Sequence, residues 1–325
     1  MNGTATKKIT TENGGKQNEP RMKNVAAKTF GVMVKRNVKL FFKDKGMFFV
    51  SLITPLILLI LYGTFLWKVY EDSFLASVQG FGQSVDTRLL KGCVGGELLS
   101  SLLAVSCVTV AFCANMLMVQ DKVNGVDNDL KMTPVKSGTL AMSYYVATLL
   151  STLIVSFTAL GAGLIFIAIK GWYLSFADVL LIIIDVVILT AFGTALSSLI
   201  GYFLSSQGQI SAVGTIVSSG YGFICGAYMP LSQFPAWLQK AIMFLPGTYG
   251  TSLLRNHCMG GTFRKMAELF PEQIEEIKKS VDCVLYFFGH KVSMGAMYAV
   301  LIGSVIALIA AYCIVVKIKN GRKGA

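Results

Sequence analysis

The chain has 325 residues, of which 54% are hydrophobic and 14% are charged, and its mean hydropathy is +0.63. Soluble domains carry about 25% charged residues, so this composition excludes a water-soluble globular protein and predicts that lipid surrounds much of the chain. The net charge of +12 raises the alternative of nucleic-acid binding. The basic residues lie outside the apolar segments, however, where they are typical of membrane orientation and lipid-headgroup contacts. We therefore expect membrane lipids, and no nucleic acid, as partners.

The first 46 residues contain eleven Lys or Arg and three acids. Residues 1–24 are polar and predict a disordered cytoplasmic tail. Residues 25–46 differ, because apolar residues fall on one helical face (Phe30, Val34, Val38, Phe41) and lysines on the other (Lys28, Lys35, Lys39, Lys43). This pattern predicts a basic amphipathic helix in the cytoplasmic interface. The helix is either a membrane anchor alone or also a contact for a soluble partner.

Six apolar segments are long enough to cross a bilayer, which takes roughly 20 residues. They form a predicted membrane domain over residues 47–316: Met47–Trp67, Leu98–Val119, Leu140–Ile169, Val179–Leu204, Ile210–Tyr228 and Val292–Val316. Pro55 is expected to kink the first span.

Charge in the short loops predicts the orientation. The basic tail at 317–325 carries four Lys or Arg and the loop at 120–139 carries three. Together with the N-terminal tail they place both termini in the cytoplasm. The segment at 229–291 carries seven basic residues and five acids, but long segments contribute little to this rule.

Polar residues within the spans have two interpretations each. Asp185 should face protein or water, either bonded to a neighbour near the headgroups or in a substrate or proton path, and we expect no second acid or His beside it. Glu97 is expected to be solvated at the outer end of its span. Small residues at four-residue steps predict close helix packing, within one subunit or at a subunit seam: Gly193, Ser197, Gly201 and Ser205.

The sequence contains no pattern typical of enzymes or metal sites. It has only two His and seven scattered Cys, so no set of clustered metal ligands is expected. Cys258 and Cys283 fall in one segment outside the spans and are either free or disulfide-bonded. The phosphate-binding pattern GxxxxGK followed by Ser or Thr is absent, so the chain does not bind ATP in that manner.

The segment after the fifth apolar run predicts two helices outside the membrane. Pro235–Leu245 places aromatic and apolar residues on one side, which is typical of an interfacial helix. Pro271–Val281 has Pro at its start, acids early and lysines late, which favours a short helix.

The loop after the second span contains Asp121, Lys122, Gly125, Leu130, Thr133, Pro134 and Val135. In this order and spacing, these residues resemble the cytoplasmic loop of ABC type-2 exporter permeases. Two positions depart from the family pattern, because Val126 replaces a usual Thr and Asn128 a usual Glu.

A second stretch resembles the same family in the same order along the chain. The residues are Gly226, Pro230, Phe234, Pro235, Trp237, Leu238, Leu245, Pro246, Thr248, Tyr249 and Arg255. With the amphipathic helix before the first span, the resemblance covers residues of about 25–316.

The resemblance implies an all-α membrane protein with six transmembrane helices, an N-terminal interfacial amphipathic helix and a re-entrant external segment between spans five and six. It implies a non-enzymatic permease in a bacterial cell membrane, paired as a homodimer or with a related permease. A separate ATPase subunit would hold ATP and Mg. Contacts with that ATPase are expected from Phe30, Val34, Phe41, Asp121, Lys122, Gly125, Leu130, Thr133 and Pro134. An external gate is expected from Gly226, Pro230, Pro235, Trp237, Pro246, Tyr249 and Arg255.

The substrate remains open at this point. Few fixed charges in the spans favour export of a hydrophobic or amphipathic molecule such as a drug, antibiotic, peptide or lipid, as in multidrug efflux. Lipid-linked polysaccharide is the alternative within the family. Other classes are a secondary transporter or channel, for which Asp185 is the candidate residue, and a non-transporting immunity or sensor subunit. An intramembrane enzyme is disfavoured because HExxH and GxSxG are both absent.

Overall fold

The computed structural model describes residues 19–79, 86–133 and 135–321. Residues 1–18 of the predicted tail, Pro134 and residues 322–325 lie outside this part of the chain. The elements in chain order are α1 (Glu19–Lys43), α2 (Lys45–Leu61), the π-helical turn η1 (Tyr62–Leu66), α3 (Trp67–Gln79), α4 (Thr87–Val123), α5 (Val126–Met132), α6 (Ser137–Lys170), α7 (Phe176–Phe203), α8 (Gln207–Ile224), the 3-10 turn η2 (Leu231–Gln233), α9 (Ala236–Ile242), α10 (Pro246–Cys258), α11 (Gly260–Leu269), α12 (Ile274–Ser280), β1 (Tyr286–Phe287), β2 (His290–Lys291) and α13 (Met294–Gly321).

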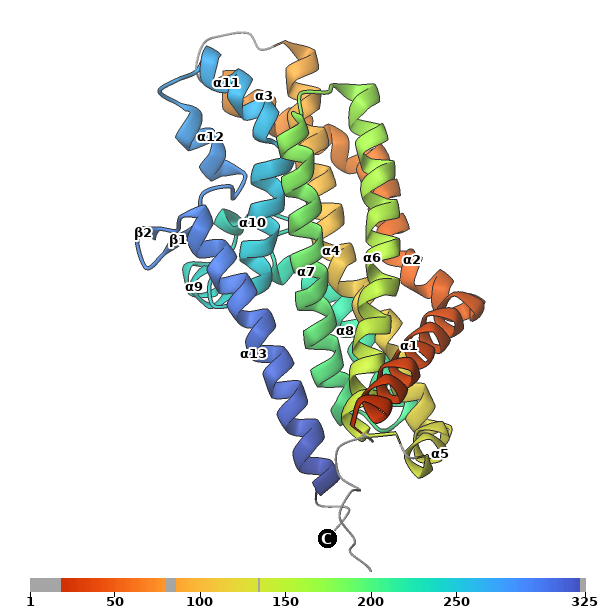
Figure 1. The fold of residues 1–325 in the computed structure, drawn as a ribbon. Coiled ribbons are helices and arrows are strands. Elements are labelled where there is room, and N and C mark those ends of the chain that lie inside the picture. Colours follow the sequence, from red (N-terminus) through yellow and green to blue (C-terminus); the bar gives the residue numbers. More distant parts are fainter. Residues whose placement is uncertain (1–18, 80–85, 134, 322–325) are drawn as a thin grey trace, which may run out of the picture.

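Helix α4 is the centre of the bundle. It contacts α2, α3, α6, α7, α8, α10 and α11. Of its most apolar stretch of 18 residues, 89% is buried. Its neighbours cover it on all sides (Figure 1). A helix with apolar and small residues all around its circumference is expected in such a position, and α4 carries Gly, Ala, Ser and Cys along its whole length.

Among the described residues, five helical segments are long and apolar enough to cross a membrane: Lys45–Asp72, Thr87–Val123, Ser137–Lys170, Phe176–Phe203 and Met294–Lys319. The chain is thus a multi-pass helical membrane protein. The predicted fifth span at 210–228 corresponds to α8, which has 18 residues and is not among the five. The six-span prediction is therefore met in five positions.

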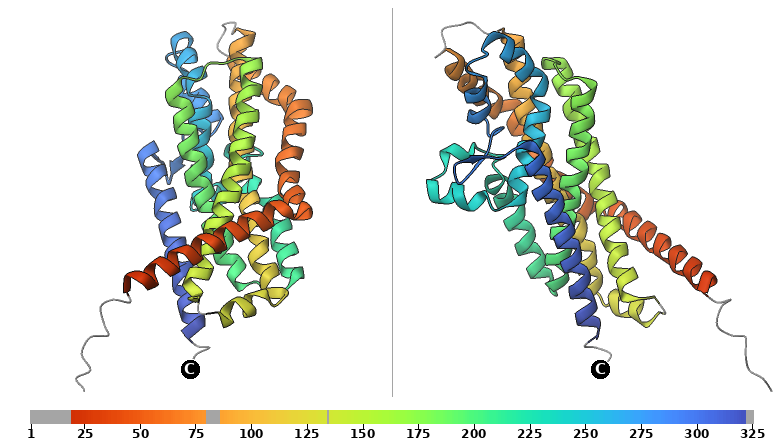
Figure 2. Two further views of the ribbon diagram at one scale, coloured as in Figure 1. Left: turned by 45° about the vertical axis from the view of Figure 1, so that its right-hand side comes forward. Right: turned by 60° about the vertical axis from the view of Figure 1, so that its left-hand side comes forward.

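The chain changes course between α8 and α13. After α8 it forms η2 and α9, and α10 then runs toward the end of the bundle where α11, α12 and α3 lie (Figure 1). The chain returns through the two-residue hairpin β1–β2 to the start of α13, which ends beside α5 at the opposite end of the molecule (Figures 1 and 2). This hairpin was not among the elements predicted from the sequence.

Helix α1 begins at Glu19, before the predicted boundary at residue 25. It crosses the bundle obliquely near the end that carries α5 (Figure 2) and packs mainly on α6. Asp44 ends α1 and caps α2, because its Oδ1 accepts a bond from the Met47 amide at 3.0 Å. Only this one residue separates α1 from α2.

The stripe of small residues on α7 packs within the chain. A Cβ on Gly193 would lie 2.9 Å from the Cys107 carbonyl oxygen, and one on Gly201 would overlap the Asn115 side chain. Asn115 also donates to the Ser197 carbonyl at 2.6 Å. These residues let α7 approach α4 closely. For Gly193, Ser197 and Gly201 this agrees with the interpretation of packing within one subunit.

Candidate functional site

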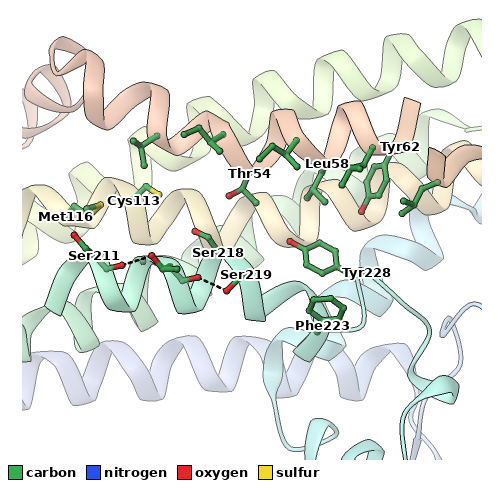
Figure 3. A pocket seen from close by; sticks show the side chains of 17 residues that line it. Thr54, Leu58, Tyr62, Cys113, Met116, Ser211, Ser218, Ser219, Phe223 and Tyr228 are labelled. Atoms are coloured by element: carbon green, nitrogen blue, oxygen red, sulfur yellow. Dashed lines mark hydrogen bonds between the residues drawn. The ribbon is translucent and has the colours of Figure 1, made fainter. Parts of the chain in front are cut away.

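A cavity of about 850 Å³ lies between α2, α4 and α8. Its α2 wall is aliphatic, its α4 wall contributes Cys113 and Met116, and its α8 wall contributes a row of hydroxyl groups (Figure 3). The volume falls within the range that holds small molecules, about 300–1,000 Å³. The lining residues include no Lys, Arg, His, Asp or Glu. The cavity therefore suits an uncharged or weakly polar molecular surface.

The hydroxyl row follows from helical spacing on α8. Ser211, Thr215, Ser218 and Ser219 recur at steps of three and four residues, so they share one face. Thr215 donates to the Ser211 carbonyl at 2.9 Å and Ser219 donates to the Thr215 carbonyl at 2.8 Å, the bonds dashed in Figure 3. Their oxygens are left as acceptors along an otherwise apolar wall.

Two tyrosines stand where the cavity approaches α9 and α10. Tyr62 comes from η1 and Tyr228 from the chain after α8 (Figure 3). The Tyr228 ring packs against Gly222, where any Cβ would overlap it. The Tyr62 hydroxyl is buried and has no partner among the described residues. Burying a hydroxyl without a hydrogen bond is costly. A molecule in the cavity that bonds to this hydroxyl would remove that cost.

Beyond these tyrosines, Arg255 of α10 is buried to 1% exposure. Its guanidinium donates to the carbonyls of Val281 and Gly226 at 3.0 and 2.9 Å, and more loosely to Asp282 and Ser101 at 3.4 and 3.3 Å. Because the charge pattern predicts that this part of the chain faces outward, we call Arg255, Asp282, Ser101 and Glu97 the outer charge cluster. One side chain thus connects α10, α4, the end of α8 and the segment after α12.

The charge of Arg255 is supported from two sides. Burial opposes it, but the carboxylates of Glu97 and Asp282 raise the pKa of the guanidinium above its ordinary value. Glu97 lies one helical turn before Ser101 on α4 and is 1% exposed, so the expectation that it is solvated is wrong. Its Oε2 has no partner among the described residues. The helix continues well beyond the predicted end of the span and buries it.

The remaining residues of the predicted external gate lie in the connections around α9. Gly226 has φ +74, a conformation that favours glycine, and Pro230 and Pro235 precede η2 and α9. Pro246 begins α10. Tyr249 donates to the Met243 carbonyl at 2.6 Å, which joins α10 to the end of α9. Trp237 is different, because 70% of its surface is exposed.

Asp185 of α7 is the centre of a second buried cluster. Its Oδ1 accepts from the Tyr298 hydroxyl of α13 at 2.5 Å, and its Oδ2 lies 2.5 Å from Nδ1 of His257 on α10. We call these three residues the Asp185 cluster. The expectation that no His accompanies Asp185 is wrong, because α10 lies against α7 and brings His257 inside. The cluster joins three helices of the bundle.

The end of α4 that leads into α5, which the charge pattern predicts to be cytoplasmic, carries a third cluster, formed by Arg36, Asp121 and Tyr144. Asp121 is 6% exposed and accepts from Arg36 of α1 at 2.9 Å and from the Tyr144 hydroxyl of α6 at 2.5 Å. We call it the cytoplasmic cluster. Because Asp121 faces inward, it connects α4 to two neighbouring helices.

The next residue, Lys122, connects α4 to α7. Its Nζ donates to the carbonyls of Gly201 and Tyr202 at 3.1 and 2.9 Å, which lie in the last turn of α7, where carbonyls lose their helical partners. It also lies 4.7 Å from the centre of the Tyr202 ring. Adjacent residues of opposite charge thus fix the end of α4 to α1, α6 and α7.

Helix α5 follows directly and is the exposed part of this end. Gly125 begins it with φ +80, a conformation in which glycine is favoured. Leu130 is half-buried, whereas Thr133 is exposed and Met132 is 85% exposed. Met132 was not predicted as a functional residue, although an apolar residue in a polar loop is a recognisable signal.

The apolar face of α1 turns toward its own bundle. Phe41 is 1% exposed and packs in a core cluster with Met33, Met47 and residues of α4 and α6. Phe30 and Val34 are half-buried. The surface of α1 that remains open includes Val32, at 60% exposure, and the lysines.

Cys258 and Cys283, the possible disulfide pair, are both buried free thiols. The segment that carries them is held instead by side-chain hydrogen bonds. Ser252 donates to the Asp282 carbonyl at 2.8 Å and Asn256 donates to the Cys283 carbonyl at 2.7 Å.

The long apolar helices define a multi-pass membrane protein, with an apolar cavity between α2, α4 and α8. A sequence model of the family described as ABC-2 type transporter matches residues 28–258. The match covers more than half of the chain, and the chain belongs to this family. It is an ABC-type membrane permease. The comparison with curated proteins gives no match.

Proposed function

We propose that the chain is the permease subunit of an ATP-driven exporter that moves a hydrophobic or amphipathic substrate out of the cytoplasm. Permeases of this family typically work with an ABC ATPase, and a separate ATPase subunit is the energy source in this proposal. The observation that carries it is the cavity between α2, α4 and α8. Its lining combines an aliphatic wall with a row of hydroxyls and includes no charged residue.

The cytoplasmic cluster provides the route by which an ATPase would act. An ATPase changes the state of a permease only if the two states differ in their contact energy with it. Met132 and Thr133 on α5 are exposed and available for that contact. Asp121 and Lys122, in the last turn of α4 just before α5, pass any movement of α5 to α1, α6 and α7 through their bonds.

This arrangement changes the roles expected from the sequence. Asp121, Lys122 and Phe41 serve as connections inside the permease, because their side chains point into the bundle. Direct contact falls to α5 and to the open surface of α1. At the other end, the outer charge cluster holds α10 against α4 beyond the cavity. We propose that these bonds keep the external gate closed.

The cavity lining favours an amphipathic molecule over a lipid-linked polysaccharide. A sugar chain needs many donors and acceptors, whereas the polar groups of the lining are the α8 hydroxyls, Thr54 and the two tyrosines. An amphipathic molecule would place its apolar side on α2 and its polar side on α8.

The test is ATP-dependent uptake of an amphipathic fluorescent dye into inside-out vesicles. The vesicles contain the full chain, co-purified with a candidate ATPase from the same genome. Gly214→Leu narrows the cavity and should reduce uptake severalfold without loss of ATPase binding. Ile216→Leu, on the exposed side of α8 at 68% exposure, is the matched control.

Two results would contradict the proposal. One is uptake that does not depend on ATP with any ATPase that the chain binds. The other is equal uptake by the Gly214→Leu variant and the wild type, which would remove the cavity from the pathway.

A further inference from the structure

The external segment has a second, smaller pocket of about 270 Å³, which lies between α9 and the hairpin β1–β2. Lys240 and Lys279 line it from opposite sides, together with the Gln239 amide and the rings of Tyr286 and Phe288. The pocket lies apart from the cavity between α2, α4 and α8, and no residue lines both.

The two lysines of the pocket differ from the other lysines of the external segment. Lys265 pairs with Glu268, and Lys291 pairs with Glu275. Lys279 lies over the Tyr286 ring at 5.4 Å. Neither Lys279 nor Lys240 forms an ion pair within the described part of the chain. Lys278 also forms no ion pair there, but it lies over the Phe263 ring at 5.7 Å and does not line the pocket, whereas Lys240 and Lys279 both face it.

One acid also lines the pocket, and its charge is already compensated. Asp282 is 6% exposed. Its Oδ2 accepts from the Leu231 amide at 2.7 Å and from Arg255 at 3.4 Å. With Arg255 balancing Asp282, the two lysines give the pocket a net positive charge. It therefore favours an anion.

The surroundings of the pocket are those of a bilayer interface. Phe244, Phe287 and Phe288 pack edge to face, with ring centres 4.9–6.1 Å apart. Phe244, Phe288 and Trp237 are 64%, 61% and 70% exposed. Exposed aromatic rings of this kind concentrate at the level of lipid headgroups.

The position of the hairpin along α13 agrees with this level. The Val292 amide donates to the Leu285 carbonyl at 2.9 Å and closes the hairpin, and α13 begins at Met294. Of the most apolar stretch of 18 residues in α13, only 17% is buried, so most of this helix faces lipid. The hairpin and α9 lie beside its first turns (Figures 1 and 2). The pocket is thus at the end of a lipid-facing span, opposite to α5.

We propose that the pocket between α9 and β1–β2 binds the phosphate-bearing headgroup of an anionic membrane lipid. The lysines contact the phosphate, and the lipid chains lie against Phe244, Phe288 and α13. The charge distribution of the chain predicts that this is the outer leaflet. The ligand is a lipid and not free phosphate, because the aromatic surface around the pocket would otherwise face water.

The binding test uses the full chain purified from nanodiscs that contain equal amounts of phosphatidylglycerol and phosphatidylcholine. Native mass spectrometry measures which lipid the chain retains. A lysine near an anionic lipid changes partitioning roughly fivefold. The variant Lys240→Gln/Lys279→Gln should therefore lower phosphatidylglycerol retention by roughly 25-fold if the two effects add.

The control variant Lys265→Gln/Lys291→Gln removes the same charge outside the pocket and should retain the lipid as the wild type does. Equal retention of both lipids by the wild type, or equal losses in the two variants, overturns the proposal. Competition by inorganic phosphate, without any preference for lipid, would identify free phosphate as the ligand and also overturn it.

A second measurement tests the position of the pocket. In a Trp67→Phe/Trp172→Phe background Trp237 is the only tryptophan. Phosphatidylglycerol brominated near the headgroup should quench its fluorescence more strongly than lipid brominated at the chain end. An unquenched Trp237 overturns the proposal. So does a Phe288→Cys variant that forms an intersubunit disulfide in place of lipid contact, since a second copy would then cover the pocket. None of these outcomes depends on ATP-driven export.

Discussion

Replacing Arg255 with Met removes the buried cation that holds the external segment together. The change deletes two bonds to carbonyls, at 2.9 and 3.0 Å, and two longer ones to Ser101 and Asp282. It also leaves the Asp282 carboxylate buried without its counter-charge. Breaking a buried pair in this way costs about 3–5 kcal/mol. We expect the free energy of unfolding to fall by that amount.

The assay is unfolding by SDS in mixed micelles, followed by tryptophan fluorescence. Arg264→Met is the matched control, because Arg264 also bonds a carboxylate, that of Asp178, but its side chain is 55% exposed. Ion pairs with an exposed partner contribute less, about 0–1 kcal/mol. A loss in Arg255→Met no larger than that in Arg264→Met would refute the reasoning.

A double variant separates the lost bonds from the unpaired charge. Adding Asp282→Asn to Arg255→Met removes the uncompensated carboxylate while the amide oxygen still accepts from the Leu231 amide. We expect the double variant to recover about 1–2 kcal/mol relative to Arg255→Met. Additive losses in the double variant would show that the two side chains do not interact.

Three further predictions concern single contacts. Tyr298→Phe removes one bond to Asp185 and should lower the free energy of unfolding by about 1 kcal/mol in the same SDS titration; no change would place the hydroxyl outside the Asp185 cluster. Gly261→Ala places a Cβ onto the Tyr173 backbone and should cost about 1–3 kcal/mol, whereas Gly295→Ala, which meets nothing within 4 Å, should cost nothing; equal effects would argue against this packing of α11. Asp121→Asn removes the carboxylate that α1 and α6 share. It should reduce ATP-driven uptake severalfold while ATPase binding persists, and unaltered uptake would remove the cytoplasmic cluster from coupling.

The long apolar helices could be predicted from the sequence because hydropathy and end signals are local. The predicted spans at 140–169 and 179–204 lie within a few residues of α6 and α7. The start of α7 has a capping box of Ser175 and Asp178. Local signals of this kind need no knowledge of the neighbouring helices.

The polar clusters could not be predicted because their partners are distant in sequence. Glu97 reads as the solvated end of a span, and only the approach of Arg255 from α10 makes its burial tolerable. Asp185 and His257 are likewise brought together by packing of α10 on α7. The family resemblance marked Arg255 but gave no indication of these partners.

The direction in which a side chain points was also beyond the sequence. Asp121 and Lys122 belong to the loop motif, and from the sequence alone they are equally compatible with surface contacts and with connections inside the bundle. The structure turns both into the bundle, because α1, α6 and the open end of α7 surround the last turn of α4. The cavity could not be predicted for the same reason, because it depends on the spacing of α2, α4 and α8.

The central claim is that α5 lies on the side of the membrane where an ATPase would act and that the hairpin lies on the other. Cysteine labelling in a Cys313→Ser background tests it, with a maleimide that does not cross membranes and the variants Thr133→Cys and Phe288→Cys. The account predicts that Phe288→Cys reacts in intact cells, and that Thr133→Cys reacts only in inside-out vesicles. Labelling of Thr133→Cys in intact cells would contradict it.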